Sequence, residues 1–127
     1  MKKDRAKTKV VLVDDEPDFR MVVEKSLEPQ FEVSGLPDGE GLLDTLEGLE
    51  ADALILDVHL ASSNGFALCQ RVRSDPRFTD LPILFLTGSK EDEDFVHNLE
   101  VGGTAYLTKP LSPRTLKHTL HELCGRA

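Results

Sequence analysis

Short apolar runs alternate with amphipathic segments along the chain, and this alternation predicts its secondary structure. The apolar runs predict five strands, at Val10–Val13, Phe31–Val33, Ala53–Leu56, Ile83–Leu86 and Ala105–Leu107. Most of these runs are apolar at every position, which is typical of parallel strands that are buried on both faces. The run that begins at Phe31 gives the weakest signal. The pattern favours a parallel sheet with helices on both sides.

Between the predicted strands, apolar residues recur at helical spacing. They predict five helices, marked by Phe19, Val23 and Leu27; Leu42, Leu46 and Leu49; Phe66, Cys69 and Val72; Phe95 and Leu99; and Leu116, Leu120 and Leu123. Pro17 suits the first turn of the first helix, Asp38 is predicted to cap the second, and Pro76 is predicted to stop the third. Five strand–helix units predict an open, doubly wound α/β sheet.

Polar residues follow four of the five predicted strands. They are Asp14-Asp15-Glu16, Asp57, Thr87 and Thr108-Lys109. In doubly wound sheets the ligand crevice lies outside the carboxyl ends of the strands. Each residue alone has an ordinary explanation, because a carboxylate or threonine often caps a helix and a lysine is usually solvated. Their joint occurrence at four strand ends favours a functional site.

The residue types at these strand ends indicate phosphoryl chemistry. Clustered carboxylates repel one another, so they stay ionised together only where a cation shares the site. An all-oxygen site with few protein ligands suits Mg²⁺ better than zinc. With the ammonium of Lys109 and the hydroxyl of Thr87, such a site suits phosphoryl oxygens. One carboxylate can then act as the nucleophile and form an aspartyl-phosphate.

The order and spacing of five short segments carry a family resemblance. The segments are Val11–Glu16, Leu54–Asp57, Asn64-Gly65, Leu84–Thr87 and Tyr106–Pro110. Together they resemble the receiver domains of two-component response regulators, of the chemotaxis-regulator type, from about Lys9 to Cys124. The resemblance implies a flavodoxin-like α/β fold: a five-stranded parallel sheet in the order 2-1-3-4-5, with five helices.

The resemblance also implies a role for each polar residue at the strand ends. The implied roles are phosphoacceptor for Asp57; Mg²⁺ ligands for Asp14, Asp15, Asp57 and the backbone carbonyl of His59; switch hydroxyl for Thr87; switch aromatic for Tyr106; and phosphate contact for Lys109. The Lys109–Pro110 bond is expected to be cis, as is typical of the family. The chain departs from the family pattern after Asp57, where a proline usually stands four residues on and this chain has Ala61.

The function that the resemblance implies is that of a phosphoacceptor in a two-component system or phosphorelay. A histidine kinase or phosphotransfer protein would supply the phosphoryl group. The signal would pass to a downstream protein or output domain through the face formed by the helix around Phe95, the strand 105–107 and the last helix. Such a domain catalyses only its own phosphorylation and dephosphorylation, so the term enzyme fits it loosely.

Two other functions stay open at this point. A degenerate receiver that acts only as a protein-interaction module would have a broken acidic site, whereas Asp14, Asp15 and Asp57 are all present. A Mg²⁺-dependent phosphohydrolase of the haloacid-dehalogenase type would have a second acid two residues after its nucleophile. This chain has His59 there.

Composition and charge set further limits. The chain has 127 residues and a net charge of −8, which fits a single domain of about 100–200 residues. Residues 1–9 carry five basic side chains against Asp4, a net charge of +4, so the remaining 118 residues carry −12. Such an acidic body is not expected to bind nucleic acid directly. Residues 1–8 are expected to form a basic flexible N-terminus and residues 9–125 the receiver domain.

The sequence also carries signals about location. No apolar run approaches the roughly 18 residues of a membrane-spanning helix, and no membrane contact is expected. The two cysteines, Cys69 and Cys124, make no disulfide framework and have no metal-binding spacing. We therefore expect a cytoplasmic protein. The chain fits either a single-domain regulator or a receiver domain of a longer protein.

Overall fold

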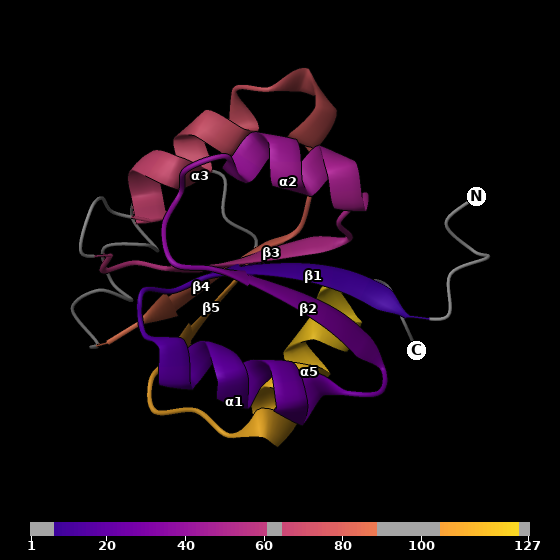
Figure 1. Cartoon of the computed structure of the whole chain (residues 1–127), viewed down its shortest axis with the longest axis vertical. Coiled ribbons are helices and arrows are strands. Elements are labelled where there is room, and N and C mark those ends of the chain that lie inside the picture. Colours follow the sequence, from indigo (N-terminus) through magenta and orange to yellow (C-terminus); the bar gives the residue numbers. More distant parts are fainter. Residues whose placement is uncertain (1–6, 61–64, 89–104, 125–127) are drawn as a thin grey trace.

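A parallel sheet lies between two layers of helices (Figure 1). The computed structural model of the chain describes residues 7–60, 65–88 and 105–124. The strands are β1 (Thr8–Val13), β2 (Phe31–Leu36), β3 (Ala53–Asp57), β4 (Ile83–Thr87) and β5 (Ala105–Thr108). They pair in parallel in the order β2-β1-β3-β4-β5. The predicted flavodoxin-like fold is therefore confirmed, and each strand is one to three residues longer than its apolar run.

The described helices cover both faces of the sheet. They are α1 (Pro17–Leu27), α2 (Leu42–Leu49), α3 (Gly65–Arg73) and α5 (Pro113–Leu123), with a short 3₁₀ helix at Pro76–Phe78. Helices α1 and α5 lie on one face, and α2 and α3 lie on the other (Figure 1). The helix predicted around Phe95 and Leu99 falls within residues 89–104, outside the described residues.

Two hydrophobic cores, one on each face of the sheet, explain the uniformly apolar strands. Successive side chains of a strand point to opposite faces. In β1, Val11 packs in the core under α2 and α3, whereas Leu12 packs in the core under α1 and α5. Edge strand β2 has only one fully buried residue, Phe31, and Glu32 is exposed. Its mixed burial explains its weak apolar signal.

The start of α2 corrects one prediction. Asp38 does not cap this helix, because α2 begins after Gly41, whose φ of 72° is left-handed. The Asp38 carboxylate instead accepts a hydrogen bond from the amide of Glu40 at 2.9 Å. The chain thus completes a turn over residues 38–41 before the helix begins. The predictions for Pro17 and Pro76 are confirmed, since α1 begins at Pro17 and α3 ends at Arg73.

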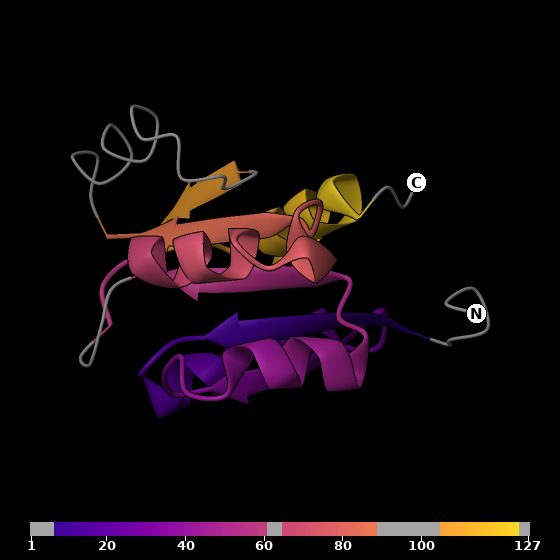
Figure 2. The same cartoon turned by 90° about the horizontal axis from the view of Figure 1, so that it is seen from above.

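The sheet brings the polar segments of the sequence to one edge. Because all five strands run in the same direction (Figure 2), their carboxyl ends meet at that edge. The residues that follow β1, β3 and β5 lie there together, although up to 95 positions separate them in sequence. None of the described helices has the length and apolar character needed to cross a bilayer.

Candidate functional site

Three carboxylates meet at the carboxyl edge of the sheet. Asp14 and Asp15 follow β1, and Asp57 is the last residue of β3. One oxygen from each of the three carboxylates lies within 4.8 Å of the others, and we call this group the acidic cluster. Asp14 is fully buried and Asp57 is 7% exposed, while Asp15 is half-buried. Three carboxylates this close repel one another unless a cation balances them.

Each buried carboxylate of the acidic cluster divides its two oxygens in the same way. One oxygen accepts a hydrogen bond from a backbone amide two residues later: Glu16 N to Asp14 Oδ1, and His59 N to Asp57 Oδ1, both at 2.9 Å. The other oxygen, Oδ2, bonds to Lys109 in both cases. The turns after β1 and β3 therefore orient the two carboxylates toward one shared cation.

Lys109, which follows β5, supplies that cation. Its Nζ lies 2.9 Å from Asp14 Oδ2, 3.0 Å from Asp57 Oδ2 and 3.5 Å from Glu16 Oε1. The ammonium also lies 4.2 Å from the ring centroid of Phe19, a cation–π contact. The Lys109–Pro110 bond is cis, as expected. One ammonium therefore neutralises part of the charge of two buried carboxylates.

Burial and ion pairing act against each other at Lys109 and Asp57. Burial raises the pKa of Asp57 above its usual 3.8, while Lys109 and the His59 amide oppose that rise without cancelling it. Burial alone would lower the pKa of Lys109, but its bonds to Asp14 and Asp57 leave that pKa raised. The Asp57 carboxylate is thus less stable as an anion than a solvated one, and it gains from further positive charge.

The two predicted switch residues occupy β4 and β5. Thr87 ends β4 and is fully buried. Its hydroxyl lies 3.3 Å from Thr108 Oγ1 and 3.5 Å from the Leu107 carbonyl oxygen, so it bonds to β5. Tyr106, on β5, is half-buried and packs against the core under α2 and α3. Asp57 aligns with Leu86 in the β3–β4 register, one residue before Thr87.

The His59 side chain is exposed, and its backbone amide is the group that contacts Asp57. The role of its carbonyl as a metal ligand stays a prediction.

The close approach of the β3 backbone explains why a glycine, Gly65, stands at the first position of α3. A Cβ at Gly65 would lie only 2.5 Å from the Asp57 carbonyl oxygen, and the Gly65 amide donates to the Val58 carbonyl at 3.0 Å. This glycine lets α3 begin directly against the end of β3.

Two residues that contact the site were not predicted as part of it. Phe19 appeared in the sequence only as part of the apolar face of α1, yet its ring lies against Lys109. Arg20 donates from Nη1 to the backbone carbonyl of Asp14 at 2.6 Å. The sequence gives no local signal for that bond, because an arginine on an amphipathic helix is usually solvated.

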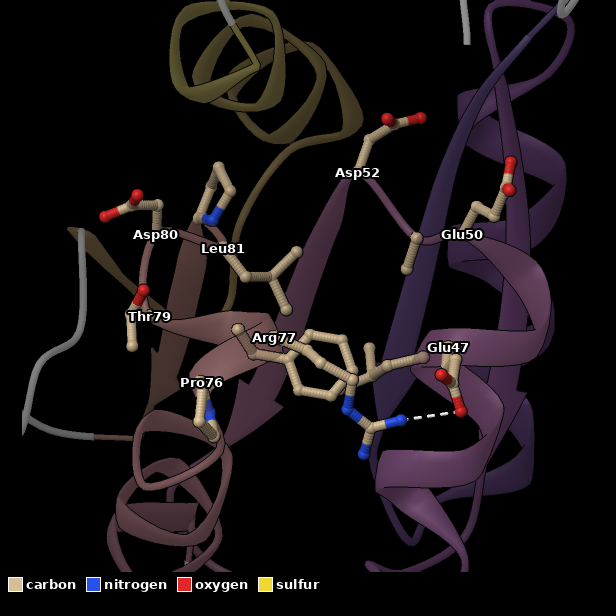
Figure 3. A pocket seen from close by; sticks show the side chains of 12 residues that line it. Glu47, Glu50, Asp52, Pro76, Arg77, Thr79, Asp80 and Leu81 are labelled. Carbon is tan, nitrogen blue, oxygen red and sulfur yellow. Dashed lines mark ion pairs between the residues drawn. The ribbon is translucent and has the colours of Figure 1, made fainter. Parts of the chain in front are cut away.

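A separate pocket of about 460 Å³ lies at the opposite end of the sheet, where β3 and β4 begin (Figure 3). The Arg77 guanidinium lies on its wall, paired with Glu47 at 2.6 Å and with Asp75 at 2.7 Å. Arg77 lowers the pKa of Asp75 to about 2. This pocket contains none of the residues predicted for the site. The Arg77–Glu47 pair therefore joins α2 to the segment after α3, and neither ion pair contributes to the acidic cluster.

Comparison with known proteins identifies the family. The family model described as "Response regulator receiver domain" matches residues 10–121. The transcriptional regulatory protein GltR of Pseudomonas aeruginosa is 39% identical over 119 residues, which cover 93% of this chain and 49% of that protein. The alkaline phosphatase synthesis transcriptional regulatory protein PhoP of Bacillus subtilis is 33% identical over 120 residues, 94% of this chain and 49% of that protein.

Solved structures agree with this result. The chemotaxis protein CheY4 of Vibrio cholerae has a TM-score of 0.84 at 33% identity, and the match covers 93% of this chain and 99% of that one. The receiver domain of the sensor histidine kinase PA1611 of Pseudomonas aeruginosa has a TM-score of 0.84 at 26% identity, covering 94% of this chain and 99% of that one. That structure has a magnesium ion coordinated in its active-site cleft.

The chain belongs to the response regulator receiver domain family of two-component systems. It carries an acidic cluster that fits a phosphoacceptor aspartate and a Mg²⁺ site. Receiver domains in these systems interact with histidine kinases and with output domains. The chain spans about half the length of GltR and PhoP.

Proposed function

We propose that Asp57 is the phosphoacceptor of this receiver domain and that its donor is a histidine kinase or a histidine phosphotransfer protein. The observation that carries the proposal is the sharing of one ammonium by two buried carboxylates. Lys109 pairs with Asp57 and Asp14 at 3.0 and 2.9 Å. The third carboxylate, Asp15, lies within 4.8 Å of both. This arrangement suits a phosphoryl group, whose negative oxygens need nearby cations.

The acidic cluster fits a Mg²⁺ ion by the chemistry of its donors. All three side chains offer carboxylate oxygens, and Mg²⁺ is usually held by one or two carboxylates together with waters and phosphate oxygens. Asp14, Asp15, Asp57 and the backbone carbonyl of His59 would hold the ion. When bound, it would neutralise charge on the transferring phosphoryl group. The magnesium in the related PA1611 receiver domain supports this assignment.

The residues of the chain then have distinct roles in the transfer. A carboxylate oxygen of Asp57 attacks phosphorus, and the bond from phosphorus to the donor's nitrogen or oxygen breaks as the acyl phosphate bond forms. The amide of His59 orients the Asp57 carboxylate during the attack. Lys109 exchanges part of its contact with Asp57 for the incoming phosphoryl oxygens. Slow hydrolysis of the Asp57 acyl phosphate resets the domain.

The output signal would pass through β4, the neighbour of β3, and through β5 beyond it. The Thr87 hydroxyl would turn from its partners on β5 to a phosphoryl oxygen, and Tyr106 would move from half-buried to buried. The changed face includes β5 and α5, together with the predicted helix around Phe95. A downstream protein or an output domain would read that face. Cys69 and Cys124 form no disulfide bond, which agrees with a cytoplasmic location.

The boundaries and partners of the unit belong to the same proposal. Residues 9–125 form the receiver domain, and residues 1–8 form a basic N-terminal segment. The net charge of −12 on the remainder of the chain after residue 9 supports binding to proteins and opposes direct contact with nucleic acid.

A labelling experiment tests the phosphoacceptor. Acetyl phosphate with Mg²⁺ should add one acid-stable, base-labile phosphoryl group, and Asp57→Asn should abolish it. Asp80→Asn is a matched control, because this exposed carboxylate lies at the opposite end of the sheet, where β4 begins. Label that persists in Asp57→Asn, or that maps to Ser62, Ser63 or Thr87, would show that the acceptor is wrong. Continuous phosphate release without accumulated label would indicate a phosphohydrolase instead, and absence of any label an interaction module.

A second experiment tests the metal ligands. Asp15→Asn should greatly slow phosphorylation while the fold stays intact, because the loss of one carboxylate weakens Mg²⁺ binding. The chain has no tryptophan, so amide chemical shifts or calorimetry must report the metal. A variant that is phosphorylated at the wild-type rate would contradict the assignment of Asp15.

A further inference from the structure

The side chain of Arg20 connects α1 to the turn that carries the acidic cluster. Arg20 lies in α1, and its Nη1 donates to the backbone carbonyl oxygen of Asp14 at 2.6 Å. The guanidinium is half-buried and carries a permanent positive charge. A hydrogen bond from a charged donor is stronger than one between neutral groups. Arg20 is therefore well suited to hold this carbonyl in one orientation.

The carbonyl that Arg20 holds belongs to the peptide group that joins Asp14 to Asp15. The other polar groups of Asp14 are engaged too: its amide donates to the Leu36 carbonyl at 3.0 Å, and its Oδ1 accepts from the Glu16 amide. Because a peptide group is planar, fixing its carbonyl also fixes the direction in which the chain enters the next residue. The bond from Arg20 thus fixes the peptide plane from which the backbone enters Asp15, the residue that carries the third carboxylate.

The neighbouring strand leaves room for the Arg20 side chain. A Cβ at Gly35, on β2, would lie 3.0 Å from Arg20 Cδ and 3.1 Å from Glu24 Oε2. The aliphatic part of Arg20 therefore passes over a position where any larger residue would crowd it. Arg20 contacts β2 through Gly35 and the end of β1 through Asp14, so it is held on both sides. An arginine held in this way is pre-organised for its hydrogen bond to the Asp14 carbonyl.

We infer that Arg20 is a positioning residue for the metal site, acting through the Asp14 carbonyl on the position of Asp15. The inference rests on the proposed function, since it assigns Arg20 a part in Mg²⁺ binding at the acidic cluster. Arg20 does not contact the phosphoryl group. Its loss should therefore raise the Mg²⁺ concentration required for half-maximal phosphorylation of Asp57, while the rate at saturating Mg²⁺ changes little.

The test compares Mg²⁺ affinity in the full-length wild type, Arg20→Met and a control variant. Arg20→Met keeps an unbranched stem over Gly35 but removes the donor. Lys25→Met is the control, because it removes a positive charge from an exposed position of the same helix. The Mg²⁺ dissociation constant, followed by amide chemical shifts, should rise about tenfold in Arg20→Met, the lower end of the range for groups that orient metal ligands. In Lys25→Met it should stay near the wild-type value.

Two further measurements separate positioning from a general loss of structure. In the metal-free protein, the amide shifts of Asp15 and Glu16 should change in Arg20→Met and stay unchanged in Lys25→Met. Arg20→Lys retains a donor without the planar fork, and it should recover part of the lost affinity. If Arg20→Met fails to fold in a urea titration, Arg20→Gln, which is too short to reach the carbonyl, gives the same comparison.

The outcomes distinguish this inference from the proposed function. Wild-type Mg²⁺ affinity in a folded Arg20→Met or Arg20→Gln variant would overturn the role of Arg20. An equal loss of affinity in Lys25→Met would overturn it too, because charge alone would then explain the effect. A wild-type protein that binds no Mg²⁺ would instead contradict the proposed function.

Discussion

Lys109 forms a 3.0 Å ion pair with Asp57, although β4 lies between β5, which Lys109 follows, and β3, which ends at Asp57. The same ammonium bonds to Asp14 at the end of β1, one strand further across the sheet. One lysine at the end of the edge strand β5 thus connects the carboxyl ends of β5, β3 and β1. This contact brings the fixed positive charge of the site onto both buried carboxylates.

Removal of Lys109 should destabilise the metal-free protein. In Lys109→Met, two buried carboxylates lose their shared donor. We expect the free energy of unfolding to fall by about 1–3 kcal/mol, the cost of leaving a buried polar group without its partner. Urea denaturation at neutral pH measures the change, and Lys25→Met should stay within about 0.5 kcal/mol of wild type because its side chain is exposed. Equal stability of Lys109→Met and wild type would mean that the ion pairs contribute nothing net.

Asp57→Asn, which replaces the carboxylate with an uncharged amide, should raise the free energy of unfolding of the metal-free protein at neutral pH. Burial raises the folded-state pKa of Asp57 above its usual 3.8, although Lys109 opposes the rise. The protonated form of Asp57 therefore favours the folded state. Its contribution to the free energy of unfolding is complete below the unfolded-state pKa and is lost as the pH rises through the higher folded-state pKa.

Urea titrations of wild type and Asp57→Asn across the acid range measure this effect. The two proteins should have similar stability below the unfolded-state pKa of Asp57. As the pH rises through the folded-state pKa, the variant should become the more stable of the two. If Asp57→Asn is less stable than wild type at neutral pH, the ion pair with Lys109 outweighs the cost of burial.

Substitution of Gly65 should disturb the end of β3. The added methyl group of Gly65→Ala would lie 2.5 Å from the carbonyl oxygen of Asp57 and 3.2 Å from the Cα of Val58. Because both are backbone atoms, α3 or β3 must shift, and overpacking of this kind typically costs roughly 1–3 kcal/mol. The free energy of unfolding measures the cost, and the amide shift of His59 reports the movement.

Gly48→Ala is the matched control for that change. Gly48 lies in α2, and a Cβ there meets no atom within 4 Å. This substitution should raise the free energy of unfolding by about 0.5–1 kcal/mol, since alanine favours a helix more than glycine does. Equal effects of the two substitutions would show that the close contact at Gly65 is unimportant.

The hydroxyl of Thr87 should carry the response to phosphorylation. A charge-assisted hydrogen bond to a phosphoryl oxygen contributes about 1.5–3 kcal/mol, enough to shift a two-state equilibrium by roughly 10- to 100-fold. Thr87→Ala should still accept the phosphoryl group on Asp57 but lose most of the structural change near Tyr106.

Amide chemical shifts with and without beryllofluoride, a tetrahedral stand-in for the phosphoryl group, measure that change. Thr87→Ser, which keeps the hydroxyl, should respond as the wild type does. Equal shifts around Tyr106 in wild type and Thr87→Ala would show that another group transmits the signal.

The local pattern of the sequence determined most of the secondary structure. The central strands β1, β3 and β4 are buried on both faces, so their apolar runs needed no knowledge of the rest of the chain. Proline likewise marked the start of α1 through its fixed φ. The cap of α2 was predicted wrongly, because Asp38 bonds within a turn and the left-handed backbone of Gly41 delays the helix.

The sequence also determined which residues stand at the strand ends, since parallel strands place their carboxyl ends at one edge. Only the tertiary structure decided which of them touch. The contact of Lys109 with Asp57 and Asp14 depends on strand order, and those of Arg20 with Asp14 and Gly65 with Asp57 depend on how each helix packs against the sheet. Residues up to 95 positions apart meet there, and hydrophobic periodicity, which reports only on near neighbours in the chain, contains no information about such distances.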